Sequence, residues 1–263
     1  MAGHDTVPLA RCSNHHEIEP RNIDEKYRQY VTIMNSSPVK SSQSGVHQRL
    51  DSVVLRHLKS DWRQPLHQPT INAFEKLLAL PGFNAGRNLI LDSGCGTGAS
   101  TRLIAEQFPD SIVIGIDQSA DRLSRLGFEE FPCSIGNTFW IRAELASFWR
   151  LALENGWQLE RHYLLYPNPW PKPAHLSRRW HAHPVFPKML RLGGQLELRC
   201  NWEVYADEFA RAVELVCDNA EISRESARNE ADWDAIKTPF GSKYGRSGHT
   251  LFRVQADLQP CSH

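Results

Sequence analysis

Hydrophobic residues stand at helical spacing before residue 85 and in short continuous runs after it. Between Leu50 and Leu58 they fall at i, i+3, i+4 and i+8, which predicts one face of an amphipathic helix. A second stretch of this kind, 71–78, is stopped by Pro81 and Gly82. The pattern therefore predicts a helical lead-in over residues 46–85.

Residues 1–45 show no sustained periodicity and are mostly polar. The segment SSPVKSSQSG, residues 36–45, has the composition of a linker. Such a stretch offers little apolar surface to bury, so the sequence predicts an extended or disordered arm.

From Asn88 onward, buried runs alternate with helical segments. Strand-like runs are LILD (89–92), IVIGID (112–117), HYLLY (162–166), QLELR (195–199) and LFRVQ (251–255), while 101–108 and 203–216 have helical character. Strand, helix, strand alternation is typical of a mostly parallel sheet with helices on both faces. We expect a doubly wound, Rossmann-like α/β domain over residues 86–258, followed by a short tail, 259–263.

Composition restricts the class of protein without naming a partner. The 263 residues are 41% hydrophobic, enough for one domain with a substantial core, and 30 Lys and Arg balance 30 Asp and Glu. The six cysteines include no CxxC pair, which argues against a zinc cluster or a disulfide framework. No apolar run reaches the roughly 20 residues of a membrane span, and the first residues lack the apolar stretch of a signal peptide. A cytoplasmic protein is the simplest interpretation.

A glycine-rich turn, DSGCGTG (92–98), follows the first predicted strand of this domain. Glycine allows a tight turn and a close approach of backbone to ligand, so Gly94 and Gly96 are candidate cofactor residues. Asp117 ends the next strand, 23 residues after Gly94, where a carboxylate can accept the hydroxyls of a ribose.

The turn alone leaves the cofactor open. Residues 94–99 also satisfy a loose GxGxx(G/A) dinucleotide pattern, and a tight turn without a ligand is a further alternative. Asp92 favours S-adenosylmethionine, because a carboxylate suits the cationic amino group of that cofactor and would repel a pyrophosphate.

The segment YPNPWPKPAHLSRRW (166–180) is a stiff, basic, aromatic loop after a strand. Its four prolines exclude an inner strand or a helix interior. No acid occurs between Glu160 and Glu197, so the surrounding surface suits a phosphate backbone, with Trp170 available to stack on a base. The alternative is a chance basic face with Trp170 packed in the core. His181 and His183 lack further ligands at metal spacing, so no metal is expected.

Three segments resemble the bacterial tRNA (guanine-N7)-methyltransferase family, from about Asn88 to 255. Residues 166–179 are similar to its hallmark loop FPDPWPKxxHxKRR, and CNWEVYA (200–206) is similar to its TDWExYA. The segment NTFWIRAE (137–144) resembles the part of the family in which an acid contacts the adenine end of the cofactor. The resemblance implies a class I fold with a seven-stranded sheet, S-adenosylmethionine as cofactor and Glu144 as a cofactor ligand.

On the acceptor side the sequence departs from the family. Asn168 and Asn201 stand where the family has aspartate, and its TxFE motif appears as Thr238-Pro239-Phe240-Gly241. The resemblance implies a catalytic position for Asn168 and tRNA as partner. It also implies a set of substrate-binding residues: Lys172, Arg178, Arg179, Asn201 and Thr238.

Loss of three acids leaves three functions open. Guanine N7 methylation of tRNA is favoured. An exocyclic amine or a small molecule is the second possible acceptor, since Asn168-Pro169-Trp170 is similar in part to the Asn-Pro-Pro-aromatic loop of amino-group methyltransferases. A relative that binds cofactor or RNA without turnover is the third.

Overall fold

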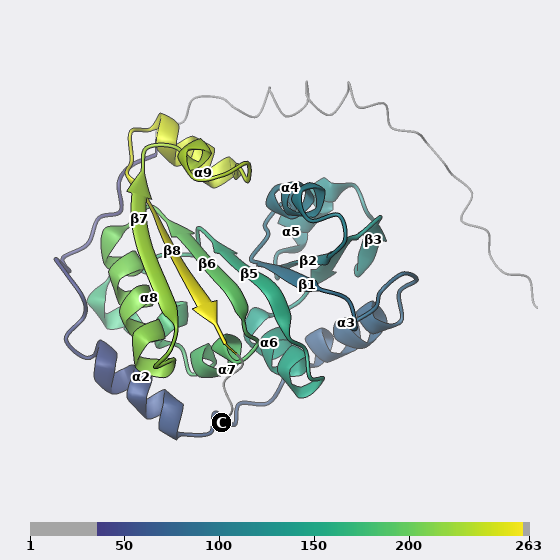
Figure 1. The fold of residues 1–263 in the computed structure, drawn as a ribbon, viewed down its shortest axis with the longest axis horizontal. Coiled ribbons are helices and arrows are strands. Elements are labelled where there is room, and N and C mark those ends of the chain that lie inside the picture. The colour runs from purple at the N-terminus through teal and green to yellow at the C-terminus, as the bar shows by residue number, and fades with distance from the viewer. Residues whose placement is uncertain (1–35, 260–263) are drawn as a thin grey trace, which may run out of the picture. The chain divides into compact units, whose positions relative to one another are not determined.

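An eight-stranded sheet runs through residues 36–259, the part of the chain that this computed structural model describes (Figure 1). Its strand order is β3-β4-β2-β1-β5-β6-β8-β7. The strands are β1 (Leu89–Ser93), β2 (Ile112–Asp117), β3 (Cys133–Ile135), β4 (Thr138–Arg142), β5 (Leu159–Leu165), β6 (Gly194–Cys200), β7 (Glu221–Ala227) and β8 (Leu251–Leu258).

Five neighbouring strands, β4, β2, β1, β5 and β6, run parallel. Strand β8 is antiparallel to both of its neighbours, β6 and β7. The sheet is therefore mixed, with the predicted parallel part at its centre. The resemblance predicts seven strands; the additional one, β3, pairs antiparallel with β4 at the edge and has three residues, too few for a sequence signal.

Helices cover both faces of the sheet, as the doubly wound prediction requires. The helices are α2 (Leu50–Lys59), α3 (Gln68–Leu78), α4 (Ala99–Gln107), α5 (Ala120–Leu123), α6 (Leu145–Glu154), α7 (Phe186–Leu190), α8 (Glu203–Val216) and α9 (Pro239–Arg246). The two helices predicted before residue 85 are confirmed as α2 and α3. Figure 1 shows α8 beside β7 and β8, with α2 packed against it.

Alternation along the strands divides the core into two main clusters. Leu89 and Leu91 of β1 belong to a large cluster with α2, α3, α6, α7 and α8, whereas Ile90 belongs to a smaller one with Ile104 of α4. Successive side chains of a strand point to opposite faces, so these clusters lie on opposite faces of the sheet. Both faces being covered explains why β1 and β2 are buried along their whole length.

The last part of the predicted arm, residues 36–45, is bound to the domain. The Ser36 amide donates to Ser247 Oγ at 2.9 Å, and Ser41 Oγ donates to the Pro171 carbonyl at 2.6 Å. The composition of this segment predicts an extended or disordered arm. In the structure its polar groups pair with the loop after β5 and the end of α9. The rest of the arm, 1–35, and most of the tail, 260–263, lie outside the described residues. Among the described helices, none has the length and apolarity needed to cross a membrane.

Candidate active site

The glycine turn joins the end of β1 to the start of α4. Gly94, Gly96 and Gly98 all have positive φ, at 82°, 59° and 73°, a conformation that side chains with a Cβ rarely adopt. At Gly98 a Cβ would also lie only 2.6 Å from Trp140 Nε1. The Gly94 amide donates to the Ile116 carbonyl of β2 at 2.7 Å, which fixes the turn at the carboxyl ends of both strands.

Asp92 is a buried acid with one unsatisfied oxygen. Its Oδ2 accepts hydrogen bonds from Ser100 Oγ and Thr101 Oγ1, both at 2.7 Å, whereas Oδ1 has no partner among the described residues. Burial raises the pKa of Asp92 to about 6, and the two hydroxyls oppose that shift. A free, buried carboxylate oxygen beside the turn fits a cationic group, so it fits the amino group of S-adenosylmethionine.

Asp117 ends β2 and is already tied to the turn. Its Oδ2 accepts from the Gly96 amide at 2.9 Å, and its Oδ1 accepts from the Ser119 amide at 2.8 Å. The Arg122 guanidinium lies 3.5 Å from Oδ2 with its side chain 54% exposed. Each carboxylate oxygen keeps lone-pair capacity, so binding of ribose hydroxyls stays a prediction that this geometry allows.

A pocket of about 680 Å³ opens at the carboxyl ends of β2 and β4. Gln118, Ala143 and Glu144 form one part of its wall. Glu144 is the N-cap of α6, and its two oxygens accept from the amides of Ala146 and Ser147 at 3.0 and 2.7 Å. The cap holds this carboxylate rigidly at the wall, where the resemblance places the adenine end of the cofactor.

The loop after β5 carries Asn168 between two strained residues. Tyr166 and Trp170 have φ of 52° and 45°, in the left-handed region that non-glycine residues seldom occupy. Backbone strain of this kind clusters at functional sites and persists only where surrounding contacts hold it. Asn168 and Lys172 are exposed on this loop.

The Arg178-Arg179 pair is split between surface and core. Arg178 is exposed, and its guanidinium lies 4.8 Å from the ring centre of Trp170. Arg179 is completely buried, and its Nη1 lies 2.5 Å from Glu208 Oε2. The same guanidinium donates to the Trp170 carbonyl at 3.2 Å. Arg179 therefore anchors the loop, which corrects the prediction that it binds substrate.

Trp170 is neither a free stacking surface nor a core residue. It is half-buried, with Arg178 over its ring and His175 edge-on at 5.6 Å. A base that stacked on the face covered by Arg178 would have to displace that side chain.

Asn201 and Thr238 are both engaged with protein groups. Asn201 Nδ2 lies 3.1 Å from His249 Nδ1, and His249 Nε2 lies 2.8 Å from the Ser36 carbonyl. A carbonyl can only accept, so His249 carries its proton on Nε2 and Asn201 donates to Nδ1. Thr238 is buried as the N-cap of α9, which corrects the prediction that its hydroxyl is available to substrate.

Two buried acids, neither of them predicted from the sequence, bind the side chains that hold the loop after β5 and the start of α9. Glu208 of α8 binds Arg179 and His181, and Glu230 binds Thr238 and Arg199. Glu208 stands on the face of α8 that also presents Tyr205 and Phe209, so an acid at an apolar helical position is the signal that could have found it. Within the described ranges, no group of three or more potential ligands could hold a metal ion.

The central strand order β4-β2-β1-β5-β6-β8-β7, the glycine turn after β1 and the acid that ends β2 define a class I, S-adenosylmethionine-dependent methyltransferase. The family model described as "Putative methyltransferase" matches residues 86–254, and the chain belongs to this methyltransferase family.

Several curated proteins are similar to this chain over most of their length. It is 25% identical to the tRNA (guanine-N(7)-)-methyltransferase of Acinetobacter baylyi, over 71% of this chain and 70% of that protein. It is 29% identical to the protein of the same name from Paramagnetospirillum magneticum, over 62% of this chain and 69% of the other. A solved structure, titled "Structure of an Antibiotic Related Methyltransferase", matches the fold with a TM-score of 0.50 at 11% identity, covering 75% of this chain and 97% of that one.

Proposed function

We propose that this protein transfers a methyl group from S-adenosylmethionine to N7 of a guanine in tRNA. The observation that carries the proposal is the strained, anchored loop after β5. It exposes Asn168, Lys172 and Arg178 in the segment that resembles the hallmark motif of the tRNA (guanine-N7)-methyltransferase family. Bound S-adenosylmethionine supplies an electrophilic methyl group on its sulfonium sulfur. Guanine N7 offers a lone pair, so no proton has to leave before transfer, and alignment with electrostatic stabilisation would provide most of the rate.

Six of the candidate site residues have a role in this proposal. Asp92 would bind the amino group of the cofactor, Asp117 its ribose and Glu144 the wall beside its adenine. Asn168 would accept one hydrogen bond from the edge of the guanine through its amide oxygen. Lys172 and Arg178, both exposed, would bind the RNA backbone near the methylated nucleotide.

The direct test incubates the full chain with radiolabelled S-adenosylmethionine and tRNA from a strain that lacks the guanine-N7 enzyme. We expect label in 7-methylguanosine after digestion to nucleosides. Label in another nucleoside would mean a different acceptor atom, such as an exocyclic amine. Cofactor binding without labelled product would contradict the proposal and identify a relative that does not turn over.

Restoring a carboxylate at residue 168 should raise the activity. A hydrogen bond to a charged group contributes about 1.5–3 kcal/mol, against about 0.5–1.5 kcal/mol for a neutral one, and methylation places positive charge on the base. We therefore expect Asn168→Asp to increase the rate constant of 7-methylguanosine formation by about fivefold to tenfold, measured on the same tRNA under single-turnover conditions.

Asn201→Asp is the comparison at the second position where the chain has asparagine and the family has aspartate. Asn201 donates to His249, and an aspartate at that position cannot donate unless it is protonated. We expect no gain from this change, alone or added to Asn168→Asp. An equal gain from both substitutions would contradict the assignment of Asn201 to the His249 contact.

A further inference from the structure

Helix α9 begins with half of a capping box. Its N-cap, Thr238, accepts a hydrogen bond on Oγ1 from the Gly241 amide at 2.8 Å. In a complete capping box the residue at this third helical position is Glu or Gln, and its side chain accepts from the backbone amide of the N-cap. Here that position is Gly241, which has no side chain to do so.

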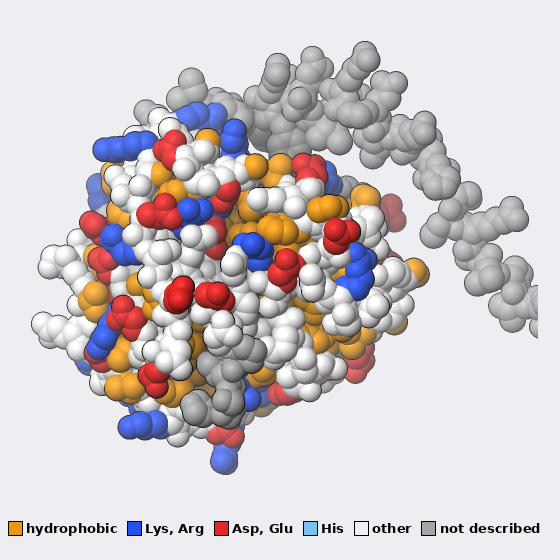
Figure 2. All heavy atoms as spheres, in the orientation of Figure 1, with side chains coloured by type: hydrophobic (Ala, Val, Ile, Leu, Met, Phe, Trp, Pro, Cys, Tyr) orange, Lys and Arg blue, Asp and Glu red, His pale blue; other side chains and the backbone are white. Residues whose placement is uncertain are grey.

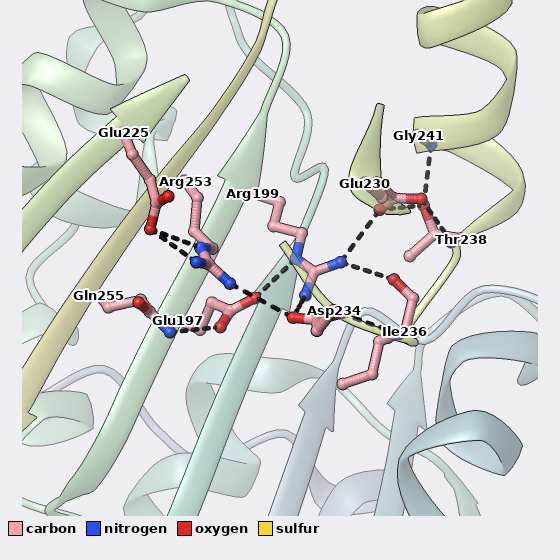
Figure 3. A network of polar contacts seen from close by, with 10 residues as sticks. All are labelled: Glu197, Arg199, Glu225, Glu230, Asp234, Ile236, Thr238, Gly241, Arg253 and Gln255. Carbon is pink, nitrogen blue, oxygen red and sulfur yellow. Dashed lines mark hydrogen bonds and ion pairs between the residues drawn. The ribbon is translucent and has the colours of Figure 1, made fainter. Parts of the chain in front are cut away.

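Glu230 provides the missing acceptor from outside the helix (Figure 3). Its Oε2 accepts from the Thr238 amide at 2.6 Å, and its Oε1 accepts from Thr238 Oγ1 at 3.0 Å. A Cβ placed on Gly241 would overlap the carboxylate of Glu230. The acid of residue 230 therefore occupies the space in which a side chain at residue 241 would begin, and glycine at 241 is what makes room for it.

The same carboxylate is linked to the centre of the sheet. The Nη1 atom of Arg199, on β6, lies 3.4 Å from Glu230 Oε1 (Figure 3). The same guanidinium also pairs with Glu197 and Asp234, at 2.6 and 2.5 Å. Removal of Glu230 would leave Arg199 paired with two acids. A variant at residue 230 thus changes the start of α9 without leaving a buried charge uncompensated.

Glu230 also lies beside Tyr166, the strained residue that starts the Asn168 loop. Burial raises the pKa of Tyr166, and the charge of Glu230 raises it further. The Tyr166 hydroxyl is buried. Glu230 therefore contacts α9 and β6 and lies next to the beginning of the loop that faces the acceptor.

Helix α9 brings aromatic rings to this side of the site. Tyr244 packs on Tyr166 with ring centres 5.5 Å apart, and it stacks on His249, the partner of Asn201, at 5.3 Å. Phe240, 44% exposed, also stacks on Tyr244, with ring centres 6.2 Å apart. Lys243 and Arg246 are exposed on the same helix, and Figure 2 shows basic side chains gathered where Figure 1 places α9.

We propose that Glu230 is a positioning residue that replaces, from outside α9, the acid of a capping box, and thereby sets α9 and Tyr166 against the acceptor RNA. This proposal rests on the proposed function, since it gives α9 a place in RNA recognition. Glu230 would act through Thr238 at the start of α9, and α9 would act on the loop through the packing of Tyr244 on Tyr166. Phe240 and the basic residues of α9 would meet the nucleic acid.

The test moves the acid from residue 230 to residue 241 in the full chain. Glu230→Ala removes the acceptor, Gly241→Glu adds a second acid into occupied space, and the double variant Glu230→Ala with Gly241→Glu rebuilds the capping box within α9. We expect each single variant to speed tryptic cleavage after Lys243 and Arg246 about tenfold, because the N-terminus of α9 is weakened. The double variant should bring the cleavage rate back to within about twofold of that of the unaltered protein. Glu225→Ala is the matched control, because Glu225 pairs with Arg253 at 2.6 Å, away from α9.

Kinetics separate positioning from a general loss of folding. We expect Glu230→Ala to raise the KM for tRNA about tenfold, with kcat and cofactor affinity within about twofold of those of the unaltered protein. The double variant should recover the original KM. A fall in kcat at constant KM, or a double variant as readily cleaved as the single ones, would overturn the proposal. If the unaltered protein does not methylate tRNA, the proposed function fails, and the cleavage comparison still decides whether Glu230 caps α9.

Discussion

Asp92→Asn is expected to weaken S-adenosylmethionine binding about 10-fold to 150-fold and to leave the protein folded. Hydrogen bonds to charged groups contribute about 1.5–3 kcal/mol, and each 1.4 kcal/mol is a factor of ten in affinity. The amide keeps an oxygen for the Ser100 and Thr101 hydroxyls, but it removes the charge that the free Oδ1 offers to an ammonium group. Isothermal titration with the cofactor at pH 7.5 measures the change.

Asp110→Asn serves as the control, because Asp110 is an exposed aspartate on the loop after α4. We expect that variant to bind the cofactor as the unaltered protein does. Equal affinities for Asp92→Asn and the unaltered protein would show that Asp92 has another use than binding the amino group.

The same carboxylate predicts how cofactor affinity depends on pH. Burial raises the pKa of Asp92 to about 6 from its ordinary value of 3.8, so the acid is protonated in the free protein below pH 6. The stability that this group contributes is present below pH 3.8 and lost as pH rises through 6. Binding of an ammonium group requires the ionised form, so affinity should fall about tenfold per pH unit below 6. An affinity that is constant between pH 5 and 7 would contradict this account.

The proximity of Asp92, the glycine turn and Asp117 could be predicted from the sequence, because all three belong to one βαβ unit. In a parallel sheet the carboxyl ends of neighbouring strands meet at one edge, so Asp92 and the glycine turn after β1 had to lie beside Asp117 at the end of β2. The sequence distance between them is about one βαβ unit. The partners of the Asp92 carboxylate are also local, since Ser100 and Thr101 follow within the first turn of α4.

The acceptor half depends on contacts between distant segments, which spacing does not reveal. Arg178 and Arg179 are neighbours, and only the position of Glu208, 29 residues after Arg179, decides which of them is buried. Likewise, the sequence shows glycine at residue 241 where the family has an acid. Only the structure shows that the carboxylate of Glu230 occupies the space beside it. The Asn201 side chain binds His249, which is 48 residues away in the sequence, and His249 in turn binds the Ser36 carbonyl.

Loss of the Glu208 carboxylate should strongly reduce the stability of the fold. Four donors converge on it: Gln43 Nε2 at 2.6 Å, the His47 amide at 2.9 Å, Arg179 Nη1 at 2.5 Å and His181 Nε2 at 2.9 Å. Removing one partner of a buried ion pair costs about 3–5 kcal/mol, because the remaining charge stays buried without compensation. We expect Glu208→Ala to reduce the free energy of unfolding by that amount, measured by urea denaturation.

A surface pair on the same helix provides the control. Arg211 of α8 pairs with Asp51 of α2 at 2.7 Å, with side chains 44% and 47% exposed. Exposed pairs contribute about 0–1 kcal/mol, so Asp51→Ala should change the free energy of unfolding by no more than that. Similar losses for Glu208→Ala and Asp51→Ala would show that the buried pair contributes no more than a surface one.

Lowering the pH should destabilise the unaltered protein in the same way as removal of the Glu208 carboxylate. Burial alone would raise the pKa of Glu208, yet the hydrogen bonds from His181 and Arg179 outweigh it and lower the pKa to about 2. A carboxyl whose pKa is lowered by folding contributes stability above its ordinary value of 4.5, and loses it as pH falls from 4.5 toward 2. The difference in unfolding free energy between the unaltered protein and Glu208→Ala should therefore shrink across that window. A difference that stays constant down to pH 3 would mean that packing around residue 208, and not its charge, holds the Arg179 loop in place.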